Sequence, residues 1–297
     1  MAKKFNVIIP AAYKDFEFLQ KTIKYVSMNI KPQKIFLIID TRLVKFLPKK
    51  VKFNALVEVL DENGLLENLS FDCVKNNLVN HGLPAKRTGW FLQQFIKLGF
   101  ALSEYCDTDY YLSWDADTLP LRNIEFFTSD GKPIFTKKKE HNQAYFDTLS
   151  KILELGEYAD FSYIAEHMMF NKNVMTEMLG DIEKSPIYGD SWYEKIINAT
   201  DSTNVNSFSE FETYGNFCLN HYPNMYATQV LNTFRKAGYI AGRFISDRKL
   251  NYMSFDLDTA SFELGDYPSG IEKYFCFAYH KYLKLKEQII KKKSNLK

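Results

Sequence analysis

The sequence predicts an α/β protein with a mixed, mostly parallel sheet flanked by helices and a helical C-terminal part. Short apolar runs at residues 5–10, 34–39 and 57–61 are separated by helical patterns, as in parallel strands joined by crossover helices. A further run at 110–114 is aromatic and apolar, too short for a helix, and is followed by acidic residues and Pro120. We therefore predict a central strand whose carboxyl end lies at the ligand-binding edge of the sheet.

Length and composition favour one large globular unit. The chain has 297 residues, of which 46% are hydrophobic, with 25 Phe and 19 Tyr, and this excludes disorder as the main state. Because no long Pro/Gly/Ser linker is present, we expect a single domain over 1–297 with successive parts at 1–122, 123–270 and 271–297. The net charge is +2, so no nucleic-acid partner is expected.

The cysteines and the N-terminus favour a cytoplasmic protein. Cys73, Cys106, Cys218 and Cys276 form no C-x-x-C pair, which argues against a zinc site or a disulfide framework. The apolar segment before Pro10 is too short for a signal peptide, and no apolar stretch reaches membrane-spanning length.

Local signals predict the elements of the first half in order. Pro10 ends the first strand, and a helical pattern follows from residue 16 to about 30. Asp40 ends the second strand and Asp61 the third. Neither a G-x-G-x-x-G nor a Walker sequence occurs, so a nucleotide site here would depend on a metal ion in place of a glycine-rich loop.

Asp115 and Asp117 directly follow the central strand. Two carboxylates so placed can hold Mg²⁺ or Mn²⁺, whose other ligands are water and phosphate oxygens of a substrate. The alternative is that they only end a strand and cap a turn.

The same Asp-x-Asp spacing occurs at two other places, where the context is different. Asp107 and Asp109 lie before the central strand, in an expected solvated turn. Asp256 and Asp258 lie in a predicted strand whose alternation would turn both carboxylates to solvent. Context therefore selects the pair after the central strand.

A helix is predicted from Arg87 to about residue 105, leading into the central strand. Trp90, Gln94 and Lys97 recur on one face of it, where a ring, an amide and a cation would suit a phosphate site. The alternative is that Trp90 is a core residue and Lys97 is solvated.

After the central motif we expect a short strand at 133–136, solvated lysines at 137–139 and a strand within 161–170. This last strand contains Glu166 and His167, and a structural role is the alternative for the histidine. Residues 171–200 are expected to be helical.

The segment 207–217 predicts a helix start. Ser209 is a suitable N-cap, and Glu212 completes a capping box three residues later. Capping does not account for Glu210, which at the helix start would be free to point into a cleft and act as a general base.

The chain ends in a lysine-rich segment, 279–293, with interleaved apolar residues. It could lie on an anionic membrane surface, where each lysine contributes roughly 1 kcal/mol. A frayed, solvated terminal helix is the alternative.

These features together resemble a bacterial family of GT-A glycosyltransferases from capsule and lipopolysaccharide gene clusters, largely catalogued as a domain of unknown function. The resemblance runs from Pro10 to about Tyr222. Its carriers, in order, are Gly89 and Trp90 with Gln94 and Lys97, the segment 115–117, the segment 166–168 and the segment 209–214.

The resemblance implies a GT-A, Rossmann-like fold that binds a nucleotide-diphosphate sugar, with a UDP-sugar favoured. Residues 1–122 would form the donor-binding half and 123–270 the acceptor-binding half. Asp115 and Asp117 would position Mn²⁺ or Mg²⁺ on the diphosphate. The remaining donor-binding residues would be Pro10, Tyr13 and Asp40 beside the nucleoside, Arg87 and Lys97 at the phosphates, and Trp90 and Gln94.

The resemblance also implies a reaction. Glu210 would deprotonate the acceptor, Asp117 would be catalytic through the metal, and a hexosyl or related group would be transferred with inversion. The acceptor, a saccharide or a lipid-linked saccharide, would contact Glu166, His167 and Glu212. Many GT-A enzymes take a third metal ligand from a C-terminal histidine, for which this sequence offers His280 or His221.

Two other functions fit parts of the sequence. A phosphohydrolase of the haloacid dehalogenase type also has Asp-x-Asp after a strand, but Leu119 stands where that family has Thr or Ser. A non-catalytic glycan-binding protein would use the aromatic surfaces and a structural ion. It would leave Glu210 and the polar face of the helix from Arg87 unexplained.

Overall fold

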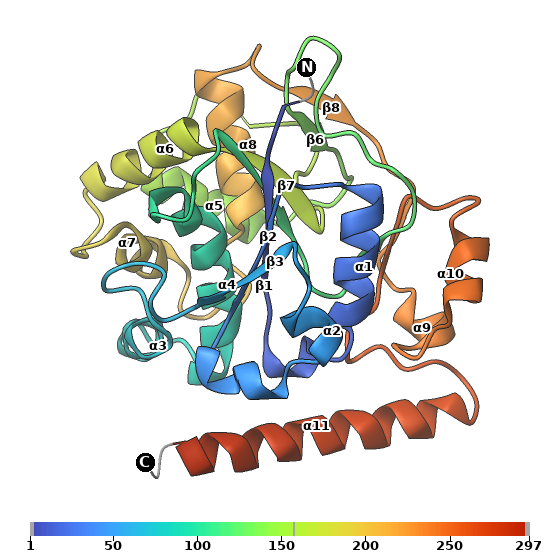
Figure 1. Cartoon of the computed structure of the whole chain (residues 1–297). Coiled ribbons are helices and arrows are strands. Elements are labelled where there is room, and N and C mark those ends of the chain that lie inside the picture. Colours follow the sequence, from blue (N-terminus) through green and yellow to red (C-terminus); the bar gives the residue numbers. More distant parts are fainter. Residues whose placement is uncertain (1–2, 157, 295–297) are drawn as a thin grey trace.

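The computed structural model describes residues 3–156 and 158–294. Its centre is a sheet of five strands in the order β3-β2-β1-β4-β7 (Figure 1). The first four strands run parallel and β7 is antiparallel to β4. The strands are β1 (Asn6–Pro10), β2 (Ile35–Ile39), β3 (Val57–Asp61), β4 (Tyr110–Trp114) and β7 (His167–Asn171).

Helices cover both faces of this sheet. Side chains alternate along each strand, so Ile8 of β1 packs into one hydrophobic core and Val7 and Ile9 into the other. The first core is covered by α3 (Phe71–Asn80), α4 (Thr88–Gly99), α5 (Gln143–Ile152), α6 (Lys172–Lys184), α7 (Trp192–Ala199) and α8 (Glu210–His221). The second is covered by α1 (Leu19–Asn29) and α2 (Lys49–Lys52).

Smaller elements surround the sheet. A three-stranded sheet has the order β5-β10-β9, and a two-stranded one pairs β6 with β8. These strands are β5 (Thr118–Pro120), β6 (Ile134–Thr136), β8 (Ala227–Gln229), β9 (Thr233–Phe234) and β10 (Thr259–Ser261). Short helices are η1 (Tyr13–Asp15), η2 (Thr41–Phe46), η3 (Ala85–Arg87), η4 (Phe100–Leu102), α9 (Gly238–Ala241) and α10 (Asp247–Met253).

The last helix, α11 (Glu272–Ser294), runs beneath the rest of the molecule in Figure 1. Its Leu283 and Ile290 are 4% and 8% exposed and share a hydrophobic core with Leu43 and Val51. The helix therefore lies against η1 and η2, the segments that follow β1 and β2. In the described part of the chain, no helix combines the length and apolar character needed to cross a membrane.

The predicted α/β fold, with a mixed and mostly parallel sheet and a helical C-terminal part, is confirmed. The predicted strands at 5–10, 34–39, 57–61, 110–114 and 133–136 all form. The strand expected within 161–170 begins only at His167, so Glu166 precedes it. Side chains from 1–122 and 123–270 share one core, while the division into donor-binding and acceptor-binding halves stays a prediction.

One predicted strand is wrong. Asp256 and Asp258 lie in a turn after α10, and β10 begins at Thr259. Asp258 accepts a hydrogen bond from the Asn232 backbone at 2.8 Å and pairs with Arg122 at 2.9 Å. Asp258 therefore stabilises a loop. Its carboxylate accepts from a backbone N–H of the loop, which in a strand would bond to a neighbouring strand.

Candidate functional site

The central Asp-x-Asp pair lies where the strand pattern places it, at the carboxyl end of β4. The β4 strand is fully buried, and its Tyr111 hydroxyl donates to the Lys97 carbonyl of α4 at 2.9 Å. The Trp114 ring nitrogen donates to the Thr118 carbonyl at 2.8 Å, which closes the turn that holds the two carboxylates. Side chains of Asp115 and Asp117 keep 27% and 25% of their surface exposed.

A buried lysine joins this pair to the start of α8. Lys97 Nζ lies 2.8 Å from Asp115 Oδ1 and 2.7 Å from Glu210 Oε1, and its side chain is only 5% exposed. Burial opposes the charge of the ammonium, but Asp115 and Glu210 outweigh it, so the pKa of Lys97 is raised above its usual value. Lys97 is thus a buried, paired cation, so the alternative of a solvated Lys97 is wrong, while a functional role of this helix face stays a prediction.

The start of α8 is fixed by the same face of α4. Gln94 Oε1 accepts the Glu210 backbone N–H at 3.2 Å, and Ser209 Oγ accepts that of Glu212 at 3.3 Å. The predicted N-cap at Ser209 is confirmed. Glu210 is 5% exposed and bound to Lys97, so its carboxylate is not free in the way that the sequence predicts, while its role as a base stays a prediction.

Asp117 belongs to a second charged group. Arg243 contacts Asp15 Oδ1 at 2.9 Å and lies 3.8 Å from Asp117 Oδ2. It also donates to the backbone carbonyls of Lys14 and Phe262, at 3.0 and 2.7 Å. Burial, with the nearby charges of Asp15 and then of Asp115, raises the pKa of Asp117 to about 7 although Arg243 opposes the shift.

A third charged group lies on the β7 side of the site. The Asp115 backbone N–H donates to the Glu166 carbonyl at 2.9 Å. The Glu166 side chain is 7% exposed and lies 2.6 Å from Arg235 Nε, and Arg235 also pairs with Glu140. Burial raises the pKa of Glu166, while Lys138 and Arg235 act in the opposite direction. Glu166 therefore lies next to the carboxylate pair.

His167 and Glu212 have structural surroundings. His167 is 2% exposed, stacks on Trp114 at 4.8 Å and contacts the Thr136 hydroxyl at 3.0 Å. Burial lowers the pKa of His167 to about 3, so its ring is neutral. Glu212 is 1% exposed and accepts hydrogen bonds from the Ser162 hydroxyl and the Tyr163 backbone. Glu212 accepts from Ser162 and Tyr163 instead of completing the predicted capping box, and the predicted contact of both residues with an acceptor stays a prediction.

The residues expected beside a nucleoside are covered in this structure. Tyr13 is 5% exposed, and Lys286 of α11 lies 5.8 Å from its ring centroid. The Asp40 carboxylate accepts two bonds from the Arg42 guanidinium, at 2.8 and 2.7 Å. Pro10 is a buried end of β1. A nucleoside at these residues would have to displace Arg42 or α11.

Arg87 and Trp90 form one stacked unit. The guanidinium carbon lies 4.0 Å from the Trp90 ring centroid, and Arg87 also donates to Asn206 Oδ1 at 2.7 Å. Burial lowers the pKa of Arg87. Trp90 is half-buried against the first core, so the alternative that it is a core residue holds in part.

The carboxylate pair fits a hard divalent cation, with few protein ligands. In residues 3–156 and 158–294, no group of three or more His, Cys, Asp or Glu side chains is arranged to hold a metal. His280 bonds to the Tyr267 hydroxyl, and His221 stacks on Phe217 at 4.3 Å. Two partly exposed carboxylates are still the oxygen donors that Mg²⁺ and Mn²⁺ prefer, with the other positions left to phosphate and water.

Sequence reasoning missed the cations and one carboxylate that surround the pair. Arg243, Arg235 and Asp15 each lie far along the chain from Asp115 and Asp117. No spacing rule links them to the motif. The only local signal is Gly242, whose positive φ of 58° marks a special turn just before Arg243.

The fold and the charged side chains define a class: an α/β protein with a cluster of paired acidic and basic residues at the carboxyl ends of its parallel strands. Residues 3–242 match the model of a family described as a family of unknown function (DUF6492), and the chain belongs to this family. Comparison with curated proteins finds no match.

Solved structures with a remote similarity include two sugar transferases. The galactosyltransferase LgtC, in complex with donor and acceptor sugar analogs, is 12% identical with a TM-score of 0.44, covering 94% of this chain and 95% of that chain. Mouse xyloside xylosyltransferase 1, in its apo form, is 10% identical with a TM-score of 0.45, covering 89% and 99%. At this level, similarity assigns no activity to this chain.

Proposed function

We propose that the protein is a metal-dependent glycosyltransferase of the GT-A type. It would move a sugar from a nucleotide-diphosphate sugar, with UDP-sugars favoured, to a saccharide or lipid-linked saccharide in capsule or lipopolysaccharide synthesis. The observation that carries the proposal is the pair Asp115 and Asp117 at the carboxyl end of β4, joined by buried Lys97 to Glu210. Such an edge is where α/β sheets bind ligands.

The chain's own residues would hold the donor diphosphate in one orientation. Asp115 and Asp117 would hold Mn²⁺ or Mg²⁺, which, when bound, neutralises the charge of the departing diphosphate. Lys97 fixes the direction of Asp115, and Arg243 fixes Asp15 beside Asp117. These contacts are made before any ligand arrives, so the two carboxylates themselves need little reorientation.

Glu210 remains the candidate base for deprotonating the acceptor, with inversion at the transferred sugar. Its Oε1 is bound to Lys97, so an acceptor hydroxyl would have to reach the carboxylate from the side away from that ammonium. The alternative is a positioning role, in which Glu210 keeps Lys97 directed at Asp115. The two roles predict different kinetics for the variant Glu210→Gln.

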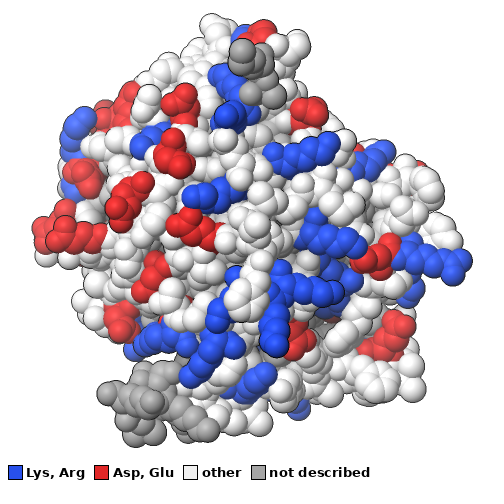
Figure 2. Space-filling model, viewed as in Figure 1, with Lys and Arg blue, Asp and Glu red and all other residues white. Residues whose placement is uncertain are grey.

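Helix α11 would attach the protein to the inner membrane from the cytoplasm. Its outer face carries an exposed apolar stripe, and Lys273, Lys281 and Lys284 are exposed beside it. The stripe consists of Ile271 just before the helix with Phe275, Tyr282, Leu285 and Ile289, which are 45–73% exposed. Figure 2 shows further Lys and Arg side chains gathered over η2 and α2, beside α11. Apolar residues flanked by lysines suit an anionic lipid surface.

The test of the transferase proposal is nucleotide binding. The melting temperature is measured with UDP, GDP, CMP and their sugar conjugates, each with and without Mn²⁺. A ligand that binds only the folded protein stabilises it by about 2.7 kcal/mol at 100 times its Kd. We expect one nucleotide to raise the melting temperature only when metal is present.

Matched variants make that test specific to the site. Asp117→Ala should lose the metal-dependent shift. Asp109→Asn, an exposed carboxylate of the Asp-x-Asp pair before β4, should keep it. If no nucleotide stabilises the protein under any metal condition, the transferase proposal is wrong and a glycan-binding protein becomes the better description. A phosphoaspartate trapped at Asp115 would instead support a phosphohydrolase.

A further inference from the structure

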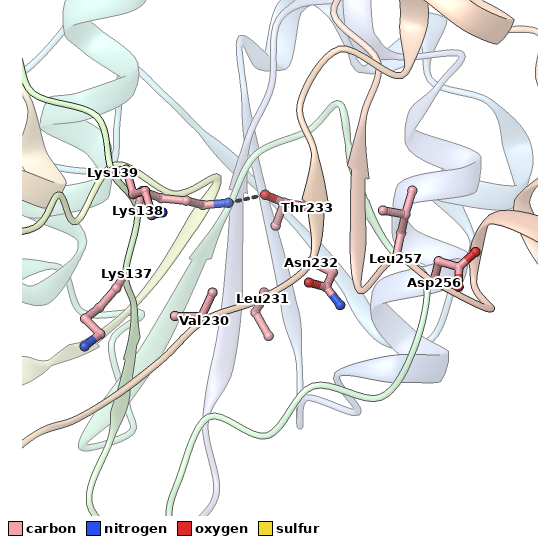
Figure 3. A pocket seen from close by; sticks show the side chains of 9 residues that line it. All are labelled: Lys137, Lys138, Lys139, Val230, Leu231, Asn232, Thr233, Asp256 and Leu257. Atoms are coloured by element: carbon pink, nitrogen blue, oxygen red, sulfur yellow. Dashed lines mark hydrogen bonds between the residues drawn. The ribbon is translucent and has the colours of Figure 1, made fainter.

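A pocket of about 410 Å³ lies beside the charged site, and three consecutive lysines line it (Figure 3). One wall is Lys137–Lys139, which directly follow β6, and the other is the segment around Asn232 and Thr233 at the start of β9. The pocket is shallow and open to solvent, so a ligand would lie along the surface. The sequence assigned these lysines only a solvated role.

Nearby carboxylates act on one of these lysines: burial lowers the pKa of Lys138, and Glu166 and Glu140 act in the opposite direction. None of Lys137, Lys138 and Lys139 forms an ion pair with any residue that the structure describes. Lys138 donates to the Thr233 hydroxyl across the pocket, and Lys137 lies 5.1 Å from the Phe161 ring centroid. Asp256 is the one carboxylate in the lining, and Figure 3 draws it at the far end from the lysines. The residues that line the pocket therefore include three lysines and one carboxylate.

The pocket adjoins the carboxylate pair through Lys138. The Lys138 backbone forms two hydrogen bonds with Ser162, at 2.8 and 3.0 Å, and its charge acts on buried Glu166. The Glu166 carbonyl in turn accepts the Asp115 backbone N–H at 2.9 Å. A molecule with one end at Asp115 could thus extend along this side towards the lysines.

We propose that this pocket binds an anionic group, a carboxylate or a phosphate, carried by the saccharide acceptor. That the ligand is an acceptor rests on the proposed function. That an anionic group binds here rests on the pocket alone. Lysine ammonium groups bind such groups as point charges. The apolar side chains of Val230, Leu231 and Leu257 in the lining would contact a sugar ring. The preferred acceptor would then be an acidic saccharide.

The test compares acidic and neutral sugars of one ring size on the full chain. Ligand-observed NMR titrations use glucuronic acid, glucose 6-phosphate, glucose and inorganic phosphate. We expect at least one acidic sugar to bind at least tenfold more tightly than glucose, with an affinity that falls as salt is raised. The double variant Lys137→Gln/Lys139→Gln should lose the difference, and Lys132→Gln, an exposed lysine outside the pocket, should keep it.

Each outcome decides something. Equal binding of glucose and the acidic sugars, or acidic-sugar binding unchanged in the double variant, overturns the inference. If inorganic phosphate binds as tightly as glucose 6-phosphate, the inference that the pocket recognises a saccharide is wrong. Failure of the transferase proposal is seen separately: acidic sugars then bind while no nucleotide raises the melting temperature with metal. The unliganded melting temperature of each variant shows that it is folded.

Discussion

Lys97 is the residue on which the site depends. It is a buried cation with two carboxylate partners, and both partners lose their compensating charge if it is removed. Removing one member of a buried ion pair costs about 3–5 kcal/mol, because the remaining charge is left without a partner. Lys97→Met should therefore lower the free energy of unfolding by about this amount in urea denaturation.

The double variant Lys97→Met/Glu210→Gln checks the cause. Removing the Glu210 charge as well should restore part of the loss, leaving Asp115, which is partly exposed, to be solvated. A double variant that is as unstable as the sum of its two single changes would show that the ion pair contributes nothing beyond packing.

Glu210→Gln separates the two roles of this carboxylate. A general base acts only in the chemical step, so its loss should lower kcat by about 10²-fold or more while nucleotide binding with metal survives. A positioning residue for Lys97 would instead raise KM for the donor as well. Full activity in Glu210→Gln would exclude both roles. Ser209→Ala, which removes only the cap, is the control for disturbing the start of α8.

The ionised form of Asp117 lowers the stability of the folded protein. Its pKa is raised from 3.8 to about 7, so the folded protein holds the ionised form at a cost. That cost is absent below the unfolded pKa and is fully present once the pH has risen through about 7. Asp117→Asn should therefore stabilise the metal-free protein at pH 8 by about 1–3 kcal/mol, with no gain near pH 4. Urea denaturation with EDTA measures it, and a destabilised variant at pH 8 would contradict it.

At the scale of elements, α8 approaches the segment before β7 closely at Gly215. Gly215 makes this approach possible: a Cβ at this position would lie 2.4 Å from the Tyr163 ring, which is 3% exposed. Gly215→Ala should therefore destabilise the protein by about 1–3 kcal/mol through overpacking.

Gly180 is the matched control in another helix. It lies within α6, and a Cβ there would meet nothing within 4 Å. Gly180→Ala should raise stability by roughly 0.5–1 kcal/mol, because alanine favours the helix. Equal effects of the two changes on the melting temperature would mean that helix propensity alone determines them. The Tyr163 ring would then move aside for the new Cβ.

Across the whole molecule, α11 combines a packing contact with the proposed membrane role. It covers Tyr13 at the carboxyl ends of β1 and β2, and it turns an apolar, lysine-flanked stripe to solvent. The membrane role is tested by cosedimentation of the full chain with phosphatidylglycerol vesicles, compared with vesicles of phosphatidylcholine alone. Leu285→Glu should reduce vesicle binding at least tenfold. It removes apolar area that would insert into the bilayer, and it adds a negative charge that anionic lipids repel.

Gln288→Glu controls for charge. It adds the same negative charge to an exposed polar position of α11, so it should cost only about 1 kcal/mol of membrane binding. If both variants bind as the wild type does, or if the wild type ignores anionic vesicles, the membrane role of α11 is wrong.

The sequence by itself determined the sheet, the position of the carboxylate pair and the start of α8. These follow from local rules: apolar runs of strand length, acidic residues after a strand, and a serine before a helix. Local periodicity and turn chemistry act over a few residues, so they are visible in the sequence.

Only the tertiary structure decided which charges meet. The binding of Lys97 to both Asp115 and Glu210, the approach of Arg243 to Asp117, and the cover of α11 over Tyr13 join residues far apart in the chain. The burial that raises the pKa of Asp117 is likewise a product of packing. Ion pairs and desolvation depend on distances in space, and no spacing in the sequence encodes those distances.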